Sequence, residues 1–200
     1  MNKNIKLFNN WAASGKDVSM QKNHANSVDE MFNILNKNNA LDKPFTFLDI
    51  GCGNGWTVRH ALKNNNCISA FGIDGSENMI KNAKSKHIGE FICQDIEDFN
   101  FDKKYDIIFS METLYYIRDI SSLINKIYQN LNDNGTAIIG IDHYKENKTT
   151  LSWGEDYNLD INTLTIKKWT KLFKNFKYVS HSLYGERKDW MGTLIIYALK

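Results

Sequence analysis

The chain has 200 residues, of which 42% are hydrophobic, and its formal net charge is +2. This length suits one globular domain with a sizeable core, and so small a net charge argues against a strongly basic nucleic-acid-binding or membrane-bound protein. No segment, including the first eleven residues, holds an apolar run long enough for a signal peptide or a membrane span. We therefore expect a cytoplasmic protein.

The three cysteines, Cys52, Cys67 and Cys93, are isolated and lack C-x-x-C spacing. This pattern fits reduced core thiols better than disulfides or a zinc site. We expect no bound metal.

The N-terminal part of the chain is expected to be helical. Val28, Met31, Phe32 and Leu35 recur at helical spacing and give one apolar face to a helix over 27–36. The chain's only proline, Pro44, ends this part. Residues 1–44 therefore form an N-terminal helical region in front of the first strand.

From residue 45 onward, apolar runs typical of buried strands alternate with helical patterns. Strands are expected at 45–50, 68–73, 91–94, 105–111 and 136–141, and helices around 58–62, after Ser76 and over 120–131. This alternation implies right-handed crossovers and a parallel sheet covered by helices on both faces. After a helix over 166–175, two strand-like runs, 178–184 and 191–199, have a short connection, so we expect a hairpin and one antiparallel strand.

A glycine-rich turn follows the first strand. Gly51, Gly53 and Gly55 stand at alternate positions, with Asp49 two residues before the first of them. Glycines permit a tight turn that a ligand can approach, and the next helix points its N-terminal amides towards it. Dinucleotide-binding turns have the spacing G-x-G-x-x-G and hold a pyrophosphate, which the charge of Asp49 would repel. S-adenosylmethionine, which carries an ammonium and a sulfonium but no phosphate, fits better than NAD.

Acidic residues end each of the first three predicted strands: Asp49, Asp74 and Asp95. Ligands of open parallel sheets bind beyond the carboxyl ends of the strands. Asp74 can accept from both hydroxyls of a ribose, and Asp95 from an adenine amino group while Ile96 packs on the ring. Met79 can cover the other ring face, although core filling is its commoner role. For any single Asp the alternative is a helix cap or a turn.

Together these segments resemble the class I, Rossmann-like S-adenosylmethionine-dependent methyltransferases of the small, single-domain type. The resemblance covers 45–141 with specific motifs, and the C-terminal strands by pattern only. It implies an α/β, doubly wound, mostly parallel seven-stranded sheet with the last strand antiparallel and helices on both faces. Asn134 departs from the family, in which a second glycine or a proline is common at this turn. The matching segments are 48–55, 72–79, 93–96, 105–110 and 131–136.

The resemblance also implies a division of the chain and a reaction. Residues 1–44 would form an N-terminal helical cap over the active site, and 45–200 the S-adenosylmethionine-binding domain, within one compact domain overall. The methyl group would pass directly from the sulfonium to a nucleophile, which requires alignment and a deprotonated acceptor. The cofactor-binding residues would be Asp49, Gly51, Cys52, Gly53, Gly55, Asp74, Gly75, Met79, Asp95, Ile96 and Ser110.

Missing motifs narrow the choice of methyl acceptor. DNA and RNA amino-methyltransferases of this class carry (Asp/Asn)-Pro-Pro-(Tyr/Phe) after the fourth strand, whereas 110–116 reads Ser-Met-Glu-Thr-Leu-Tyr-Tyr. The Pro-Cys nucleophile of pyrimidine carbon-5 chemistry is absent too, because the only proline lies elsewhere. The lysines of 167–177 could bind along a phosphate backbone. The aromatic residues between them favour an amphipathic helix, with the aromatic side chains buried and the lysines exposed to solvent.

We expect the acceptor to be bound by the loops after the fourth and fifth strands and by the N-terminal region. Their carboxylates, aromatic rings and histidines suit a small cationic or amine acceptor. Glu112 could instead pair on a loop, the histidines could be hydrogen-bonded scaffolding, and one of the two adjacent tyrosines could be core. The candidate catalytic residues are His24, Glu112, Tyr116 and His143, and the candidate substrate contacts are Trp11, Tyr115, Tyr144, Glu146, Asn147 and Trp153.

The sequence thus predicts a methyltransferase that acts on a small molecule, at an amine nitrogen in preference to oxygen or sulfur. An RNA- or protein-modifying methyltransferase is one alternative. A protein that binds S-adenosylmethionine without catalysis is another. Whether the chain is a monomer or a homodimer stays open.

Overall fold

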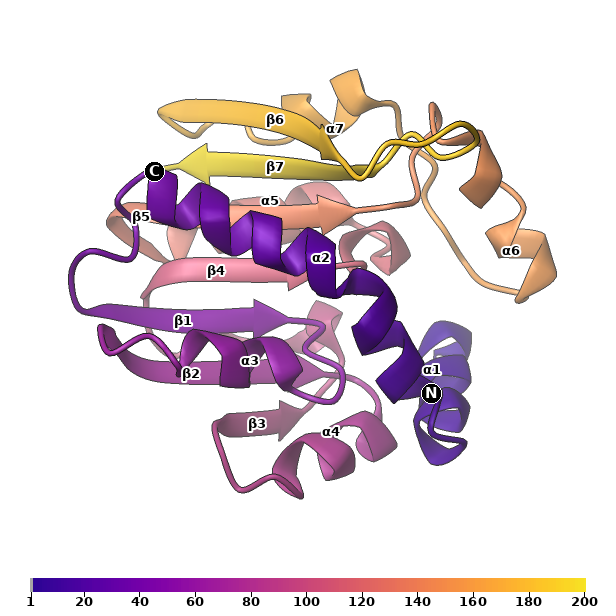
Figure 1. Ribbon diagram of the computed structural model, residues 1–200, viewed down its shortest axis with the longest axis horizontal. Helices are drawn as coiled ribbons and strands as arrows, with labels where there is room; N and C mark the ends of the chain where they lie inside the picture. Colours follow the sequence, from indigo (N-terminus) through magenta and orange to yellow (C-terminus); the bar gives the residue numbers. More distant parts are fainter. Residues whose placement is uncertain (1) are drawn as a thin grey trace.

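The computed structural model describes residues 2–200, which build one seven-stranded sheet in the order β3-β2-β1-β4-β5-β7-β6 (Figure 1). The pairs among the first five strands are parallel, whereas β7 runs antiparallel to both β5 and β6. The predicted fold class is confirmed. The strands are β1 (Phe45–Ile50), β2 (Cys67–Asp74), β3 (Glu90–Cys93), β4 (Tyr105–Met111), β5 (Leu131–Ile141), β6 (Tyr178–Tyr184) and β7 (Thr193–Leu199).

Helices cover both faces of this sheet, because successive strand residues point to opposite sides. Phe47 of β1 and Phe109 of β4 pack into one core cluster with α2, α3 and α4, whereas Leu48 and Ile108 pack into a second cluster with α5 and α7. The helices are α1 (Lys3–Ala13), α2 (Lys16–Lys37), α3 (Trp56–Ala61), α4 (Glu77–Lys84), α5 (Ile120–Gln129), α6 (Trp153–Asp156) and α7 (Ile166–Lys171).

Helix α2 is longer than the sequence pattern predicts. Only its second half, from Val28 to Leu35, packs on the sheet, and this half carries the apolar spacing. The first half extends past the carboxyl ends of the strands, where Met20, Gln21 and His24 face a cavity. A helix face that lines a cavity has no need of the apolar periodicity of a core face, so its sequence gives a weak signal.

Helix α1 lies beyond the carboxyl ends of β1 to β3 and packs beside α4 (Figure 1). Asn9 of α1 accepts hydrogen bonds from the backbone N of Asn78 at 2.9 Å and from the hydroxyl of Ser76 at 3.2 Å. At the other end of α1, Asn4 exchanges two hydrogen bonds with the backbone of Asp160. Polar contacts therefore hold this helix across the end of the sheet.

Within residues 2–200, no helix is both long enough and apolar enough to cross a membrane.

Candidate active site

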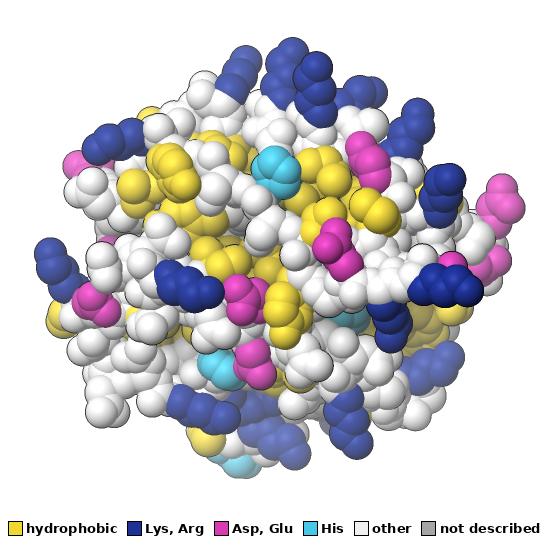
Figure 2. Space-filling view, turned by 45° about the horizontal axis from the view of Figure 1, so that its top comes forward, with side chains coloured by type: hydrophobic (Ala, Val, Ile, Leu, Met, Phe, Trp, Pro, Cys, Tyr) yellow, Lys and Arg dark blue, Asp and Glu magenta, His cyan; other side chains and the backbone are white. Residues whose placement is uncertain are grey.

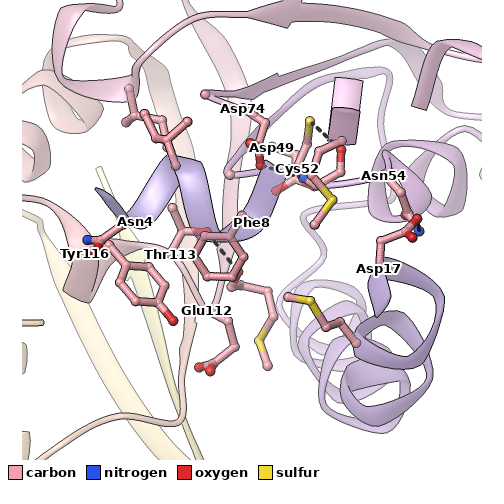
Figure 3. Close-up of a pocket in the computed structure, with 18 of the residues that line it drawn as sticks. Asn4, Phe8, Asp17, Asp49, Cys52, Asn54, Asp74, Glu112, Thr113 and Tyr116 are labelled. Carbon is pink, nitrogen blue, oxygen red and sulfur yellow. Dashed lines mark hydrogen bonds between the residues drawn. The ribbon is translucent and has the colours of Figure 1, made fainter. Parts of the chain in front are cut away.

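A cavity opens at the carboxyl ends of β1, β2 and β4, and the N-terminal helices close it on the opposite side (Figure 3). It has two ends. The glycine-turn end consists of the turn after β1 together with Asp49, Asp74, Met79, Asp95 and Ile96. The Glu112 end consists of Phe8, His24, Glu112 and Tyr116.

The glycine turn is held close against β2. The backbone N atoms of Gly51 and Cys52 both donate to the carbonyl of Ile73, at 2.8 and 3.0 Å. Gly51 has φ +78°, and a Cβ there would lie 2.0 Å from the Thr113 hydroxyl oxygen. Only glycine fits at this position, because any other residue would be strained at this φ and its Cβ would overlap Thr113.

Two carboxylates meet beneath this turn. Asp74 accepts from the backbone N of Gly53 at 2.9 Å and from that of Ser76 at 2.8 Å. Asp49 is only 2% exposed, and no residue among 2–200 donates a hydrogen bond to its side chain. Burial raises the pKa of Asp49 well above its ordinary value, and the charge of Asp74 raises it further. The pKa of Asp74 is also raised by burial, against the effect of its two backbone donors. Such a pair is suited to a cationic ligand.

The rest of the glycine-turn end combines apolar surfaces with one acid. Met79 and Ile96 line the cavity and are 3% and 8% exposed. Asp95 caps the short 3-10 helix η1 (Ile96–Asp98) by accepting from the backbone N of Glu97 at 3.1 Å. Because this uses only one acceptor position of the carboxylate, Asp95 can also accept from a ligand.

At the opposite end, Glu112 is the best-connected side chain. It accepts from the Tyr115 hydroxyl at 2.7 Å, and its other oxygen accepts from the backbone N of Asp142. Its φ is +56°, a conformation that is uncommon outside glycine and often found at functional sites. Burial raises the pKa of Glu112 well above its ordinary value, and the neighbouring charge of Asp142 adds to this.

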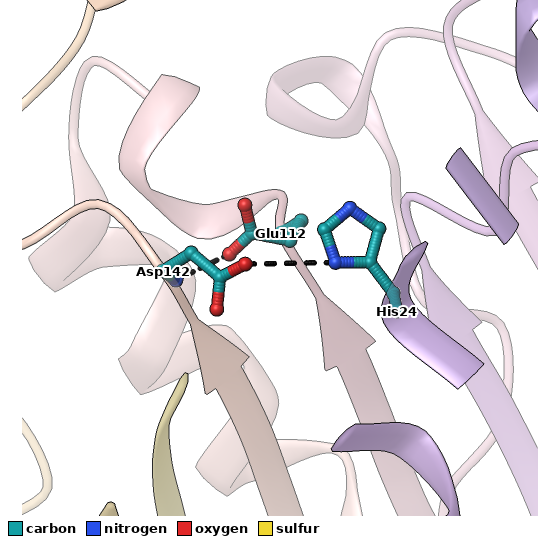
Figure 4. Close-up of side chains that lie close together, drawn as sticks. All are labelled: His24, Glu112 and Asp142. Atoms are coloured by element: carbon teal, nitrogen blue, oxygen red, sulfur yellow. Dashed lines mark hydrogen bonds and ion pairs between the residues drawn. The ribbon is translucent and has the colours of Figure 1, made fainter. Parts of the chain in front are cut away.

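His24 approaches Glu112 from α2. Its Nδ1 lies 3.5 Å from an Asp142 carboxylate oxygen (Figure 4). Burial lowers the pKa of His24, and the charge of Asp142 partly offsets this. For Asp142, burial raises the pKa and His24 lowers it. Tyr116 and Phe8 form an aromatic wall, with ring centroids 5.2 Å apart.

Most of the predicted cofactor residues line the cavity, but Gly55 and Ser110 do not. The Ser110 hydroxyl is fully buried and donates to the carbonyl of Ile50 at 2.7 Å, so it ties β4 to β1. Gly55 is the N-cap of α3, and a Cβ there would lie 2.5 Å from the Phe91 ring. Both residues support the turn from behind, and their contact with the cofactor stays a prediction.

The predicted acceptor-side residues separate into two groups. His24, Glu112 and Tyr116 line the cavity, whereas seven others lie outside its lining: Trp11, Tyr115, His143, Tyr144, Glu146, Asn147 and Trp153. The side chains of these seven have other partners in the structure, and their contact with substrate or part in catalysis stays a prediction.

The loop after β5 turns its polar side chains inward. His143 bonds the Thr150 carbonyl and the Thr163 hydroxyl, and it is 1% exposed. The Tyr144 hydroxyl donates to the Gly192 carbonyl at 2.9 Å, and Asn147 donates to the Asp142 carbonyl at 2.9 Å. Glu146 accepts from the backbone N of Ile166 at the start of α7. These side chains are scaffolding for the loop.

The remaining three are aromatic residues with packing roles. Tyr115 is 1% exposed and supports Glu112 through its hydroxyl. Trp11 packs edge-on against Phe8 and Tyr157, outside the cavity. Trp153 packs on the hydrophobic core cluster near His143.

Asp142 and Phe8 are contributors that the sequence prediction missed. Asp142 directly follows β5, so the rule that singled out Asp49, Asp74 and Asp95 as acidic strand ends also applies to it. Phe8 gave no signal, because an aromatic residue on a short amphipathic helix normally indicates core packing.

Residues 48–139 match a family model described as a methyltransferase domain. A malonyl-[acyl-carrier protein] O-methyltransferase of Acetivibrio thermocellus is 31% identical over 121 residues, which are 59% of this chain and 41% of that protein. The chain thus spans less than half the length of this relative.

Two solved structures share the fold at low sequence identity. A methyltransferase in complex with the Trm112 activator of Haloferax volcanii has a TM-score of 0.81 and 23% identity, and the match covers 96% of both chains. DhpI in complex with S-adenosylhomocysteine has a TM-score of 0.72 and 15% identity, covering 98% of this chain and 94% of DhpI. Residues 48–139 are thus similar to a methyltransferase domain, and the chain shares the fold of these two structures.

Proposed function

We propose that the chain transfers a methyl group from S-adenosylmethionine to the nitrogen of a small amine. The observation that carries this proposal is the charge of the cavity wall. Within residues 2–200 the lining contains neither lysine nor arginine, and its acidic side chains are Asp17, Asp49, Asp74, Asp95, Glu97 and Glu112. Such a wall attracts cations and repels anions.

The residues of the glycine-turn end fit S-adenosylmethionine, which supplies a methyl group on a sulfonium when bound. Asp49, whose buried carboxylate has no donor among residues 2–200, would hold the ammonium group. Asp74 keeps one free acceptor position on each oxygen and would hold the ribose hydroxyls. Ile96 and Met79 would pack on the adenine, and Asp95 would accept from its amino group.

The Glu112 end fits an amine acceptor. Tyr115 and the backbone of Asp142 fix the Glu112 carboxylate, which can still accept a hydrogen bond from an N–H group. The rings of Phe8 and Tyr116 provide faces for a cationic or apolar substituent. Fixed acceptors and walls favour alignment of the nitrogen with the methyl group, and alignment supplies much of the rate of such a transfer.

The relative from Acetivibrio thermocellus suggests methyl transfer to oxygen as a second candidate, since it is a malonyl-[acyl-carrier protein] O-methyltransferase. A malonyl carboxylate is an anion, and the cavity offers it no lysine or arginine among residues 2–200 while presenting Glu112. A bound carboxylate would be desolvated there without a cationic partner, which disfavours that acceptor. We therefore favour nitrogen over a carboxylate oxygen.

A macromolecular acceptor has less support from the surface. On the face shown in Figure 2, lysine and arginine side chains lie mainly towards the rim and do not form one continuous patch. In α7, Trp169 is fully buried while Lys167, Lys168 and Lys171 are exposed, as in an ordinary amphipathic helix. Neither feature resembles a track for a phosphate backbone.

Transfer of labelled methyl groups to a fractionated metabolite extract would test the proposal. We expect label from S-adenosylmethionine to appear in the cationic fraction as an N-methyl product, and Glu112→Gln to reduce that incorporation. Label confined to the anionic fraction as methyl esters, or to RNA or protein, would contradict it.

A further inference from the structure

Three titratable side chains converge at the Glu112 end from three separate elements (Figure 4). His24 comes from α2, Glu112 follows β4, and Asp142 follows β5. One ligand atom from each of the three lies within 4.8 Å of the others. Two of them, His24 and Glu112, line the cavity, whereas Asp142 stands behind His24.

Asp142 is fixed in its position behind the imidazole. Its side chain is 5% exposed, and its backbone is held on both sides. The N atom donates to Glu112, and the carbonyl accepts from Asn147 at 2.9 Å. These bonds fix the backbone of Asp142, and its nearly buried carboxylate lies beside His24.

This arrangement decides which nitrogen of His24 faces the cavity. Nδ1 points to the Asp142 carboxylate, and Figure 4 shows the other nitrogen, Nε2, on the far side of the ring. A carboxylate beside Nδ1 favours the tautomer with the proton on Nδ1. Nε2 then carries a free lone pair on a ring that lines the cavity, as a general base requires.

Among residues 2–200, the other groups that line the cavity around His24 include no lysine or arginine. Glu112 and Tyr116 face it from the ends of β4 and the 3-10 helix η2 (Leu114–Tyr116). From β7, the uncharged Thr193 bonds Ser27 of α2 at 2.7 Å. Across the cavity, α1 presents only uncharged side chains, among them Phe8.

We propose that His24 and Asp142 form a proton-accepting pair, and that the methyl acceptor is an aliphatic amine that enters the cavity as an ammonium ion. This inference rests on the proposed function and names its substrate class. His24 is the catalytic base, and Asp142 is a positioning residue that acts through it.

An N–H bond of the ammonium ion breaks, its electron pair stays on nitrogen, and the proton forms a bond with Nε2 of His24. The neutral nitrogen then forms a bond to the methyl carbon while the carbon–sulfur bond breaks and its electrons go to sulfur. The product leaves as an N-methylammonium ion, and His24 releases its proton to water. An ammonium ion has no lone pair, so transfer depends on the first proton step.

Imidazole ¹⁵N NMR tests the pair without any substrate. We expect neutral His24, assigned by its loss in His24→Gln, to carry its proton on Nδ1, and Asp142→Asn to lower its pKa. The matched control is Asp29→Asn, because Asp29 lies 3.9 Å from His60 and should affect that histidine alone. A proton on Nε2 of wild-type His24, or a His24 pKa that Asp142→Asn leaves unchanged, would overturn the pairing.

Methyl transfer to two probes of similar size, benzylamine and aniline, tests the substrate class. Benzylamine is an ammonium ion at neutral pH and aniline is not. We expect His24→Gln to reduce kcat/KM for benzylamine by roughly 100-fold or more, and for aniline only a few-fold. Asp142→Asn should move the rising limb of the benzylamine pH profile to lower pH. Equal losses for both amines would overturn the base role alone, whereas no transfer to either amine by the wild type would overturn the proposed function as well.

Discussion

Asp49 is a buried carboxylate of the glycine-turn end whose charged form is disfavoured by its surroundings. It is buried at 2% exposure, lacks a donor within residues 2–200, and lies close enough to Asp74 for that charge to raise its pKa. Burying a carboxylate without a partner costs several kcal/mol in real proteins. A bound ammonium group would remove most of that cost, so the ligand is expected to complete the site.

The first prediction is that the affinity for S-adenosylhomocysteine falls as the pH is lowered. Burial and Asp74 raise the pKa of Asp49 above its ordinary value of about 4, and below that raised pKa the carboxyl is neutral. It then no longer attracts the ammonium group of the ligand. Affinity is full above the raised pKa and is lost as pH falls through it, with protons released on binding. Calorimetry in buffers of different ionisation enthalpy measures this release, and an affinity that stays constant down to pH 4 would contradict the role of Asp49.

The second prediction concerns Asp74. Asp74→Asn should weaken S-adenosylhomocysteine binding roughly 10- to 100-fold, since a hydrogen bond to a charged group contributes about 1.5–3 kcal/mol. The control is Asp133→Asn, an exposed residue near the start of β5 and so at the opposite end of the sheet. Unchanged affinity in Asp74→Asn, or equal losses in both variants, would remove Asp74 from the site.

At the scale of elements, the glycine turn and α1 enclose the cavity from opposite sides. The turn is rigid, because it lies between β2 and Thr113. Helix α1 is held mainly at its polar contacts, through Asn4 and Asn9. We propose that this N-terminal region acts as a cap that closes over a bound cofactor.

The third prediction separates two effects of a side chain at Gly51: steric overlap with Thr113 and strain of the left-handed backbone. Gly51→Ala should lower the free energy of unfolding by about 2–5 kcal/mol, with roughly 1–2 from the left-handed backbone and 1–3 from the contact with Thr113. Gly185→Ala is the matched control, because its φ is nearly the same, +76°, but nothing lies within 4 Å of the added Cβ. Urea unfolding that gives equal losses for the two variants would contradict the close approach at Gly51.

The fourth prediction tests the proposed cap. Asn9→Ala removes the acceptor of two hydrogen bonds from the start of α4 and should cost about 1–2 kcal/mol. Dissociation of S-adenosylhomocysteine should become faster, because α1 opens more readily. Asn10→Ala, an exposed position on the same helix, should leave the rate unchanged. Stopped-flow rates that do not differ between the variants would rule out a role of α1 in retaining the ligand.

How far the sequence predicts these elements depends on what each residue faces. All seven strands were predicted from apolar runs and flanking turns, although β5 begins at Leu131, earlier than predicted, and Ser76 was correctly predicted as a helix cap. The first half of α2 was not predictable from apolar spacing, because it faces a cavity and lacks that spacing. On the loop after β5, Tyr144 and Asn147 are polar in sequence but buried in the fold, since distant backbone groups satisfy them. Such partners are set by tertiary contacts and leave no local signal.

At the scale of the whole molecule, the strand order determines where the cavity lies in the fold. The sheet runs outward from β1 through β2 to β3 and, in the other direction, from β1 through β4 to β5. The order thus reverses between β1 and β4, where the loops leave to opposite faces of the sheet and open a crevice. Asp49 lies at the end of β1 and Glu112 directly follows β4, so the topology brings the two ends of the cavity together.

A crystal structure with S-adenosylhomocysteine bound would test this account most directly. We expect the ligand's amino group beside Asp49, its ribose at Asp74, its adenine between Met79 and Ile96, and its sulfur turned towards Glu112 and His24. A ligand bound outside the cavity, or one whose sulfur points away from Glu112, would contradict the assignment of the two ends.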